Sequence, residues 1–331
     1  MFSVSKKKKG LALVSGGLDS TLAVKAMVDQ GLEMEAVHFT TPFCSCDKCA
    51  VNAIGEEYGI PVHHVFMGQD FLDLLVDPPH GYGSHVNICI DCRILMLRKA
   101  HELGERIGAD FYVTGEVVGQ RPFSQRMKAM RLIEREAGLE GKILRPLSAQ
   151  LLPETDIEKE GVVDRESLYS ISGRRRLPQM ELAKELGVYD YPCPSGGCLL
   201  TDPQFSKKFR DYLEHEGRPV LEDMVFLRIG RHFRVGEARV IVGRNEGENN
   251  RLQSLAEGRG IPHMSVSGYM GPVTVLLGGL NDEVVSRSAA ITVRYSDAPR
   301  DVPVDVEYFN GSVTVLRALA VSNEELEELR I

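Results

Sequence analysis

Short apolar runs alternate with amphipathic stretches along the first half of the chain. The runs are rich in β-branched and aliphatic residues and predict strands at residues 10–17, 33–40, 61–67 and 109–115. The stretches between them follow a helical period and predict helices at residues 20–30, 50–58 and 92–107. Strands that alternate with helices predict an α/β fold, in which a parallel sheet carries helices on both faces and ligands gather at the carboxyl ends of the strands.

The pattern changes from residue 173 onwards. A basic turn, GRRR, precedes a predicted helix, and a loop rich in Pro and Gly follows at residues 189–203. After a second predicted helix, the apolar runs predict strands at residues 224–235, 238–243, 263–268, 272–279, 302–309 and 312–319. We therefore expect an α/β domain in residues 1–175, a basic, cysteine-bearing connector in residues 176–221 and a smaller strand-rich α+β domain in residues 222–331.

Composition and charge are those of an ordinary globular chain, with 331 residues of which 43% are hydrophobic and 26% charged. The net charge of −8 argues against a general nucleic-acid coat but leaves room for a local basic groove. No apolar run approaches the roughly 18 residues of a membrane span. The first residues lack the apolar region of a signal peptide. We therefore expect a cytoplasmic protein that does not enter a membrane.

The string SGGLDS, residues 15–20, lies between the first predicted strand and the first predicted helix. Its glycines let backbone N–H groups approach a phosphate, and the helix N-terminus attracts an anion. The alternative is an ordinary turn with Asp19 or Ser20 as the helix N-cap. The position of the string after the first strand favours phosphate binding, and the missing GK[ST] argues against transfer of a terminal phosphate.

SGGLDS resembles the PP-loop of the N-type ATP pyrophosphatases. These enzymes adenylate a carbonyl or carboxyl oxygen, release pyrophosphate and let a nucleophile displace AMP. The resemblance implies an adenine nucleotide alpha hydrolase-like fold and a requirement for ATP and Mg²⁺. It implies that Asp19 is catalytic and lies near the magnesium. It also implies that the phosphates are bound by Ser15, Gly16, Gly17, Asp19 and Ser20. The adenosine would be bound by His38, Phe39 and Thr40.

The segment GADFYVTGEVVGQRPFSQ, residues 108–125, resembles the segment after the fourth strand of tRNA 4-thiouridine synthases. The resemblance implies that Gly115, Glu116 and Gln120 orient the nucleotide or the target base. The alternative is a capped strand end followed by a surface loop.

The seven cysteines are an odd number and fall into three clusters, which in a reducing compartment indicates metal or redox chemistry. NICIDC and PSGGCLL resemble the two cysteine loops of tRNA 2-thiouridylases, with Cys92 and Cys198 at the cysteine positions. Cys89 adds a third thiolate, and a CxxC pair with one distant cysteine resembles the iron–sulfur-dependent thiolases. This implies that Cys89, Cys92 and Cys198 hold a [4Fe–4S] cluster. A catalytic thiol or persulfide pair and inert cysteines are the alternatives, and Cys193 can replace Cys198.

FCSCDKC, residues 43–49, raises a separate question. Cys44, Cys46 and Cys49 can form a tetrahedral Zn²⁺ site with His63, His64 or His38. The same thiols can instead relay sulfur, and the sequence does not decide between these two roles.

VGRNEGENNRL and IPHMSVSGYMGP resemble the RNA-binding R domain of the NFACT family, also called DUF814, over residues 222–331. A stretch of arginines in this region can follow a phosphate backbone, and a salt-bridged surface is the alternative. These arginines are Arg228, Arg231, Arg234, Arg239 and Arg244. GRRR, residues 173–176, is a second basic candidate that lies closer in sequence to the cysteine loop.

Together these features predict an ATP-dependent tRNA sulfurtransferase, a tRNA-uridine thiolase. ATP adenylates a uracil carbonyl oxygen, and sulfur from the cluster or from a Cys persulfide replaces it. The expected partners are tRNA and a sulfur donor, either sulfide or the persulfide of a cysteine desulfurase, since neither a THUMP-like region nor a rhodanese tail is evident. The alternatives are a PP-loop ligase or amidating enzyme for a small molecule, and a non-catalytic RNA-binding factor. The choice between 2-thio and 4-thio product and the oligomeric state stay open.

Overall fold

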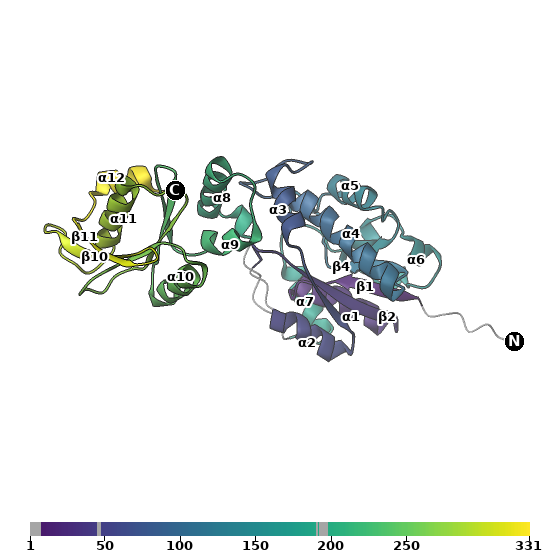
Figure 1. Cartoon of the computed structure of the whole chain (residues 1–331). Helices are drawn as coiled ribbons and strands as arrows, with labels where there is room; N and C mark the ends of the chain where they lie inside the picture. Colours follow the sequence, from purple (N-terminus) through teal and green to yellow (C-terminus); the bar gives the residue numbers. More distant parts are fainter. Residues whose placement is uncertain (1–7, 45–47, 190, 192–197) are drawn as a thin grey trace. The chain divides into compact units, whose positions relative to one another are not determined.

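The computed structural model describes residues 8–44, 48–189, 191 and 198–331. The chain divides into two compact units, residues 1–202 and 203–331 (Figure 1). The predicted connector is shared between them. Its helix α7 (Leu177–Glu185) packs against α1 (Leu18–Asp29) in the first unit, and α8 (Pro203–His215) contacts α9 (Leu221–Leu227) in the second. Over the described ranges, no helix has both the length and the apolar character needed to span a membrane.

The sheet of the N-terminal unit has five parallel strands in the order β3-β2-β1-β4-β5, which confirms the predicted parallel sheet. The strands are β1 (Lys9–Leu13), β2 (Glu33–Thr40), β3 (Val62–Phe66), β4 (Phe111–Thr114) and β5 (Ile143–Leu144). The chain runs outward from β1 through β2 to β3, then returns to β4 on the other side of β1. Ligands of such sheets bind at the carboxyl ends of the strands where the order reverses.

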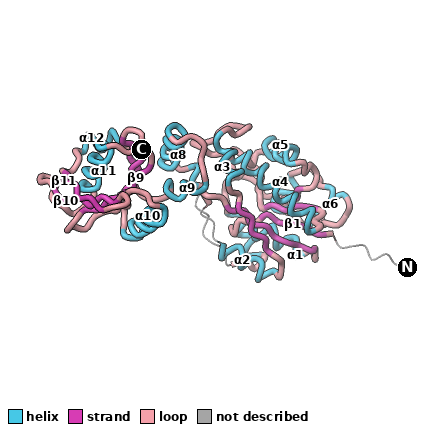
Figure 2. Tube along the Cα trace, viewed as in Figure 1, coloured by secondary structure: helices cyan, strands magenta, loops and turns pink. Residues whose placement is uncertain are grey.

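Helices cover both faces of this sheet (Figures 1 and 2). On one face, Val24 and Met27 of α1 pack against Met34 and Phe111 of the sheet. The helices α1, α2 (Lys48–Tyr58) and α7 lie on this face, and the opposite face carries α3 (Gln69–Val76), α4 (Cys89–Ile107) and α5 (Met127–Ala137). The helix α4 begins at Cys89, earlier than the predicted start at residue 92, so the whole CIDC string lies in its first turn. The short elements are α6 (Asp156–Lys159) and the 3-10 turns Pro146–Leu151, Arg165–Ser167 and Leu199–Thr201.

The C-terminal unit has a six-stranded antiparallel sheet in the order β11-β10-β8-β9-β7-β6, which confirms the predicted strand-rich α+β domain. Its strands are β6 (Arg231–Val235), β7 (Ala238–Val242), β8 (His263–Val266), β9 (Thr274–Leu277), β10 (Val304–Phe309) and β11 (Val313–Ala318). One face packs against α11 (Asp282–Arg294) and α12 (Asn323–Leu329), and the other packs against α9 and α10 (Glu246–Arg259).

One predicted strand is wrong over its first half. The apolar run from residue 224 predicted a strand, but the chain forms α9 up to Leu227 and β6 begins only at Arg231. Glu222 and Asp223 lie in the first turn of α9, where acidic side chains favour the helix N-terminus. Phe226 is buried in the core under α10. A short apolar run has no period that separates a buried helix from a buried strand.

Candidate active site

The phosphate loop joins β1 to α1. Gly16 has a φ of 77°, a left-handed conformation that glycine adopts without strain. The helix begins after Gly17, and no described side chain caps its first N–H groups, so the alternative of a capped turn is not found. The Ser20 hydroxyl donates to the carbonyl of Gly17 at 2.8 Å and accepts from the Ser15 N–H at 3.3 Å. The Ser20 N–H donates to the Gly17 carbonyl at 3.1 Å, so among the described residues the N–H groups of Leu18 and Asp19 are the ones that the first turn leaves for an anion.

Asp19, in the first turn of α1, is held by the loop that follows β4. The Gln120 side-chain amide donates to Asp19 Oδ2 at 2.9 Å. Asp19 Oδ1 and Gln120 Oε1 are buried and have no hydrogen-bond partner among the described residues. Gly115 permits this approach, because a Cβ at this position would lie 2.5 Å from the Asp19 carbonyl. Two buried oxygens without a partner fit Mg²⁺, which prefers oxygen ligands.

The segment predicted to contact adenosine ends β2, the strand next to β1. His38 is fully buried, and its Nδ1 lies 2.9 Å from the carbonyl of Val14, the residue before Ser15. A carbonyl can only accept, so Nδ1 carries the proton and Nε2 is an acceptor. Nε2 has no hydrogen-bond partner in the part of the chain that the structure describes. Phe39 is buried and Thr40 is half-buried. His38 thus offers a buried acceptor beside the phosphate loop.

Glu116 lies at the centre of a buried charge network. Its carboxylate contacts Arg93 and Arg145, each at 3.0 Å, and Arg145 also contacts Glu134. The Thr114 hydroxyl donates to the same carboxylate at 3.2 Å. Burial alone would raise the pKa of Glu116, but the two guanidinium groups hold it below its usual range. Because Arg93 follows the second cysteine of CIDC, Glu116 connects the cysteine turn of α4 to the loop beside the phosphate site.

Two hydrogen bonds fix the loop before Cys89. The Asn87 side chain accepts from the Cys89 N–H at 2.9 Å, and the Val86 N–H donates to the carbonyl of Leu200 at 3.3 Å. Cys198 lies just before the short 3-10 turn that contains Leu200. The Val86–Leu200 bond therefore joins the two loops that carry the cysteines.

The thiols of both loops influence one another. Burial is the main cause that raises the pKa of Cys92, and the thiols of Cys44, Cys89 and Cys198 add to the effect. Burial also raises the pKa of Cys198 to about 11, with additions from Cys44 and Cys89, while the positive charge of Arg121 acts in the opposite direction. The Val86–Leu200 hydrogen bond joins the loops of Cys89 and Cys198, and together with these mutual effects it indicates that Cys44, Cys89, Cys92 and Cys198 lie in one neighbourhood, which we call the thiol cluster.

The thiol cluster fits an iron–sulfur centre by the kind of its donors, because thiolates are the usual ligands of such clusters. No three His, Cys, Asp or Glu side chains converge as metal ligands within the described ranges. Cys89, Cys92 and Cys198 are thus suitable donors that lie near one another without forming a complete ligand set. Cys193, the predicted substitute for Cys198, lies outside the described residues.

The predicted zinc site has no formed ligand set among the described residues either. Cys46 lies outside those residues, and Cys49 is exposed on α2. His63 and His64 both use Nε2 to contact other side chains, at 2.7 Å and 2.9 Å. Cys44, the remaining cysteine of this string, belongs to the thiol cluster described above.

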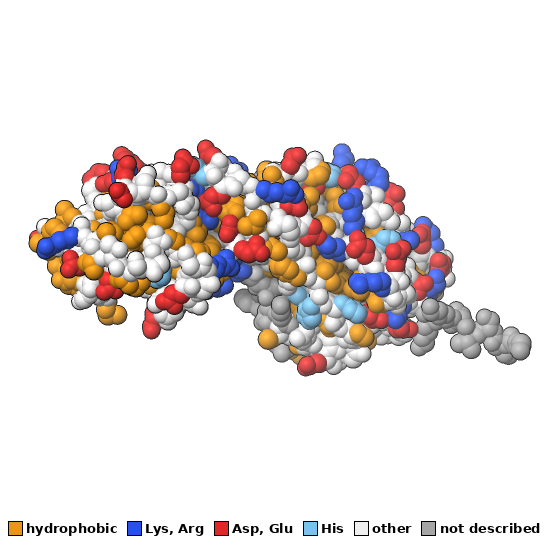
Figure 3. Space-filling model, in the orientation of Figure 1, with side chains coloured by type: hydrophobic (Ala, Val, Ile, Leu, Met, Phe, Trp, Pro, Cys, Tyr) orange, Lys and Arg blue, Asp and Glu red, His pale blue; other side chains and the backbone are white. Residues whose placement is uncertain are grey.

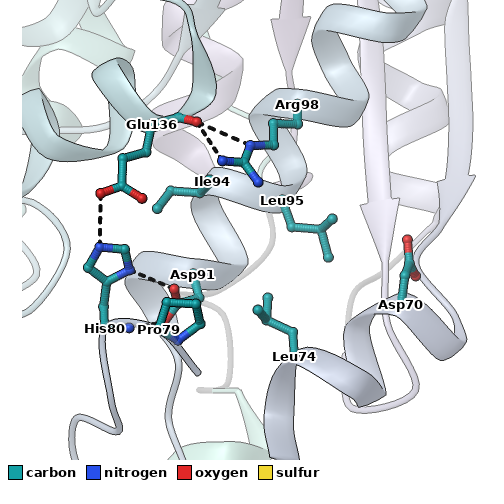
Figure 4. Close-up of a pocket in the computed structure, with 9 residues that line it drawn as sticks. All are labelled: Asp70, Leu74, Pro79, His80, Asp91, Ile94, Leu95, Arg98 and Glu136. Atoms are coloured by element: carbon teal, nitrogen blue, oxygen red, sulfur yellow. Dashed lines mark hydrogen bonds and ion pairs between the residues drawn. The ribbon is translucent and has the colours of Figure 1, made fainter. Parts of the chain in front are cut away.

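A histidine that the sequence did not single out lies beside the CIDC string (Figure 4). His80 Nδ1 contacts Asp91 at 2.7 Å and His80 Nε2 contacts Glu136 at 3.2 Å. The hydrogen bond to Asp91 is the main cause that raises the pKa of His80, and burial opposes it. A cavity of about 140 Å³ opens beside the three residues. His80 therefore ties the first turn of α4 to α5, a role that no periodic pattern or motif at residues 78–83 indicates.

In the C-terminal unit, three of the five arginines predicted to follow RNA are committed to carboxylates. Arg239 is fully buried and pairs with Glu216 at 2.9 Å. Arg234 pairs with Asp211 and Glu216, and Arg244 pairs at 2.5 Å with Glu248 in the first turn of α10. Arg234 and Arg244 are therefore salt-bridged as the alternative predicted, whereas Arg239 is paired in the interior and not on the surface. A continuous arginine track is therefore not formed.

The two strings that carried the RNA-binding resemblance lie together. Asn249, from the first string, accepts from the Val273 N–H at 3.2 Å and donates to the Gly271 carbonyl at 3.4 Å, at the end of the second. Tyr269 and Met270 lie in the same loop, and 45% and 81% of their surfaces are exposed. An exposed tyrosine is a suitable surface for an unpaired RNA base.

Two comparisons with protein families agree with these features. Residues 5–158 match the sequence model of the thiamine biosynthesis protein family (ThiI), and residues 230–330 match that of the NFACT protein RNA binding domain. The resemblances of the SGGLDS-bearing part and of the C-terminal strings are thus confirmed, while those of the cysteine loops to 2-thiouridylases and iron–sulfur-dependent thiolases stay predictions. The ThiI-like segment contains SGGLDS and CIDC, and the NFACT-like segment contains the strings around Asn249 and Tyr269. Cys198 lies between the two matched segments.

Curated relatives match mainly the ThiI-like part. A probable tRNA sulfurtransferase of Lysinibacillus sphaericus (strain C3-41) is 33% identical over 150 residues, which are 44% of this chain and 35% of that protein. One of Geobacillus kaustophilus (strain HTA426) is 27% identical over 238 residues, which are 67% of this chain and 51% of that protein. The chain thus spans between about a third and a half of the length of these relatives. A solved 4-thiouridine synthetase in complex with RNA and ATP matches with a TM-score of 0.39 and 24% identity, over 66% of this chain and 52% of that chain.

Proposed function

We propose that the protein is an ATP-dependent tRNA sulfurtransferase that replaces a carbonyl oxygen of a uridine with sulfur. One structural connection carries this proposal. Arg93, next to Cys92, pairs with Glu116 at 3.0 Å, and the neighbouring Gly115 packs on the Asp19 backbone. The thiol cluster and the phosphate loop are therefore linked through the loop that follows β4, at the carboxyl ends of the strands. The names of the curated relatives support tRNA as the substrate.

The phosphate loop performs the activation step in this proposal. The uracil carbonyl oxygen attacks the α-phosphorus of ATP, and the bond to the bridging oxygen breaks as pyrophosphate leaves. The N–H groups at the start of α1 stabilise the phosphate charge, and His38 Nε2 accepts a hydrogen bond from the adenosine side. The oxygens of Asp19 and Gln120 would hold Mg²⁺, which when bound would neutralise phosphate charge.

The thiol cluster delivers sulfur. Hydrosulfide adds to the activated ring carbon, and AMP leaves with the original oxygen. In the persulfide form, the terminal sulfur on one cysteine adds instead and AMP leaves. A second cysteine thiol then attacks the inner sulfur and releases the thiolated base, and two external thiols reduce the Cys–Cys disulfide that remains. Cys89, Cys92 and Cys198 are the residues that would hold a [4Fe–4S] cluster, which when bound would supply an open iron position for hydrosulfide.

One experiment tests the proposed activity. The full chain is purified without oxygen, its iron and acid-labile sulfide are quantified, and it is incubated with ATP, sulfide and unmodified tRNA. We expect a thiolated uridine by mass spectrometry, with one AMP formed per thiolation, and no product from Asp19→Asn. The 2-thio and 4-thio products have the same mass, so they are distinguished by chromatographic retention against the two standards and by their near-ultraviolet absorption.

The same assay separates the alternatives. AMP formation that needs no RNA, in the absence of thiolated uridine, would overturn the proposal and favour a PP-loop ligase. RNA binding without ATP turnover would favour a non-catalytic factor. Iron content decides between the cluster and the persulfide form, because only the first requires iron.

A further inference from the structure

The segment Gly173–Arg176 lies against the loop that carries Gln120. Ser172 forms a parallel bridge with Val118, and the Gly173 N–H donates to the Val118 carbonyl at 2.8 Å. Gln120, two residues further along that loop, contacts Asp19 of the phosphate site. The amino end of the arginine segment is therefore fixed beside the nucleotide site by backbone contacts.

The other end of this segment is fixed as well. Arg176 leads directly into α7, whose Leu182 and Ala183 pack in one buried cluster with Leu18 and Leu22 of α1. Because α1 begins at the phosphate loop, both ends of the segment are anchored to elements that form the site. Its position follows from the fold of the N-terminal unit alone.

The arginine side chains of this segment are exposed or half-buried, and within the described ranges they are not paired with carboxylates. Arg174 and Arg175 are exposed and Arg176 is half-buried, and none of the three forms an ion pair with a described residue. Arg121 follows Gln120 directly, is also exposed, and acts through its charge on the Cys198 thiol. Elsewhere on the N-terminal unit, acidic and basic side chains alternate on the face that Figure 3 displays. We call these four residues the arginine arc.

We propose that the arginine arc, Arg121 and Arg174–Arg176, is the surface that receives the RNA phosphate backbone beside the site. The proposal rests on the proposed sulfurtransferase function, which requires a polyanionic substrate to place one base between the phosphate loop and the thiol cluster. Guanidinium groups bind phosphates by paired hydrogen bonds and remain charged at every working pH. The arc adjoins the loop whose Gln120 holds Asp19, and three of the C-terminal arginines are already tied to carboxylates.

The test compares two double variants of equal charge. Arg174→Gln with Arg175→Gln removes two charges from the arc, and Arg131→Gln with Arg135→Gln removes two exposed charges from α5, on the opposite face of the sheet. Binding of unmodified tRNA is measured by fluorescence anisotropy from 50 to 200 mM salt, with far-UV circular dichroism to confirm folding. For the arc variant we expect about tenfold weaker binding at about 150 mM salt and a salt slope lower by about 1.8, since each duplex phosphate contact contributes about 0.9. The α5 variant and ATP binding are expected to be unchanged.

The outcomes separate this proposal from the function on which it rests. Equal loss of affinity in both double variants, or no loss in the arc variant, would overturn the docking surface even if wild-type protein thiolates tRNA. If tRNA binding depends on the arc but no thiolated uridine is formed, the proposed activity is overturned and the docking surface is supported. Wild-type protein that neither binds nor thiolates tRNA would overturn both.

Discussion

The N–H of Val86 donates a hydrogen bond of 3.3 Å to the carbonyl of Leu200. This bond joins the loop before Cys89 to the loop after Cys198, although the two are far apart in the sequence. The CxxC pair and the distant cysteine are therefore brought into one neighbourhood by the backbone itself, independently of any metal. The proposed sulfur chemistry depends on this proximity.

The first prediction concerns the individual thiols. We expect tRNA thiolation to fall at least about 100-fold in each of the variants Cys89→Ser, Cys92→Ser and Cys198→Ser. Mutation of residues that only support a metal ligand lowers metal affinity or activity about 10–100-fold, and loss of a ligand itself should lower it further. ATP binding, measured by calorimetry, is expected to stay within about twofold of wild type. Cys44→Ser tests whether Cys44 relays sulfur. A variant that loses thiolation activity but keeps its full iron content would indicate such a relay. Full activity of Cys198→Ser would contradict the three-cysteine site.

Gly115→Ala tests the approach of the β4 loop to the phosphate site. The added Cβ would lie 2.5 Å from the Asp19 carbonyl, so the start of α1 or the loop must move. We expect ATP affinity to fall about tenfold or more, measured by calorimetry. The matched control is Gly258→Ala in α10, where a Cβ meets nothing within 4 Å. This control is expected to bind ATP normally and to gain up to about 1 kcal/mol in free energy of unfolding, since alanine is the better helix former.

The sequence predicted the elements whose pattern is local. The strand at residues 33–40 was placed with its observed bounds because its apolar run ends where the loop begins. The role of the C-terminal arginines could not be predicted from the sequence, because a cluster of basic residues carries no information on which carboxylates they pair with. Arg239 is buried beside Glu216 and stacks on the Tyr212 ring, and both partners come from a region predicted only as a connector. His80 was missed for the same reason, since its partners Asp91 and Glu136 are assembled by the tertiary fold.

Glu116→Gln is expected to destabilise the N-terminal unit. The neutral amide leaves Arg145, which is almost fully buried, short of a counter-charge, and breaking a buried pair in this way costs about 3 kcal/mol. The free energy of unfolding is measured by urea denaturation at pH 7. The folded pKa of Glu116 is lowered, so its stabilisation is present above the ordinary carboxyl pKa and is lost as the pH falls through the lowered value. The difference in free energy of unfolding between wild type and Glu116→Gln should therefore become smaller in acid. A difference that does not depend on pH would contradict the lowered pKa of Glu116.

The contribution of His80 to stability is expected to depend on pH with the opposite sign. Its folded pKa is raised above 6.5, so its contribution to stability is complete below that value and is lost as the pH rises through the folded pKa. The groups that face it are Asp91 and Glu136, with Arg98 bound to the Glu136 carbonyl and Asp70 across the cavity. The stability difference between wild type and His80→Gln should be larger at pH 6 than at pH 8. An NMR titration midpoint of the His80 ring at or below 6.5 would contradict the raised pKa.

Tyr269→Ala tests RNA contact by the C-terminal unit. The ring is 45% exposed at the end of a loop that Asn249 holds through the Gly271 carbonyl. Stacking of one base on an aromatic ring contributes about 1–3 kcal/mol, so we expect the substitution to weaken binding of single-stranded RNA about fivefold or more. Tyr269→Phe keeps the ring and should retain most of the affinity, while Val302→Ala, at a 46% exposed apolar position of the same unit, should leave it unchanged. Equal losses in Tyr269→Ala and Tyr269→Phe would show that the hydroxyl, and not stacking, makes the contact.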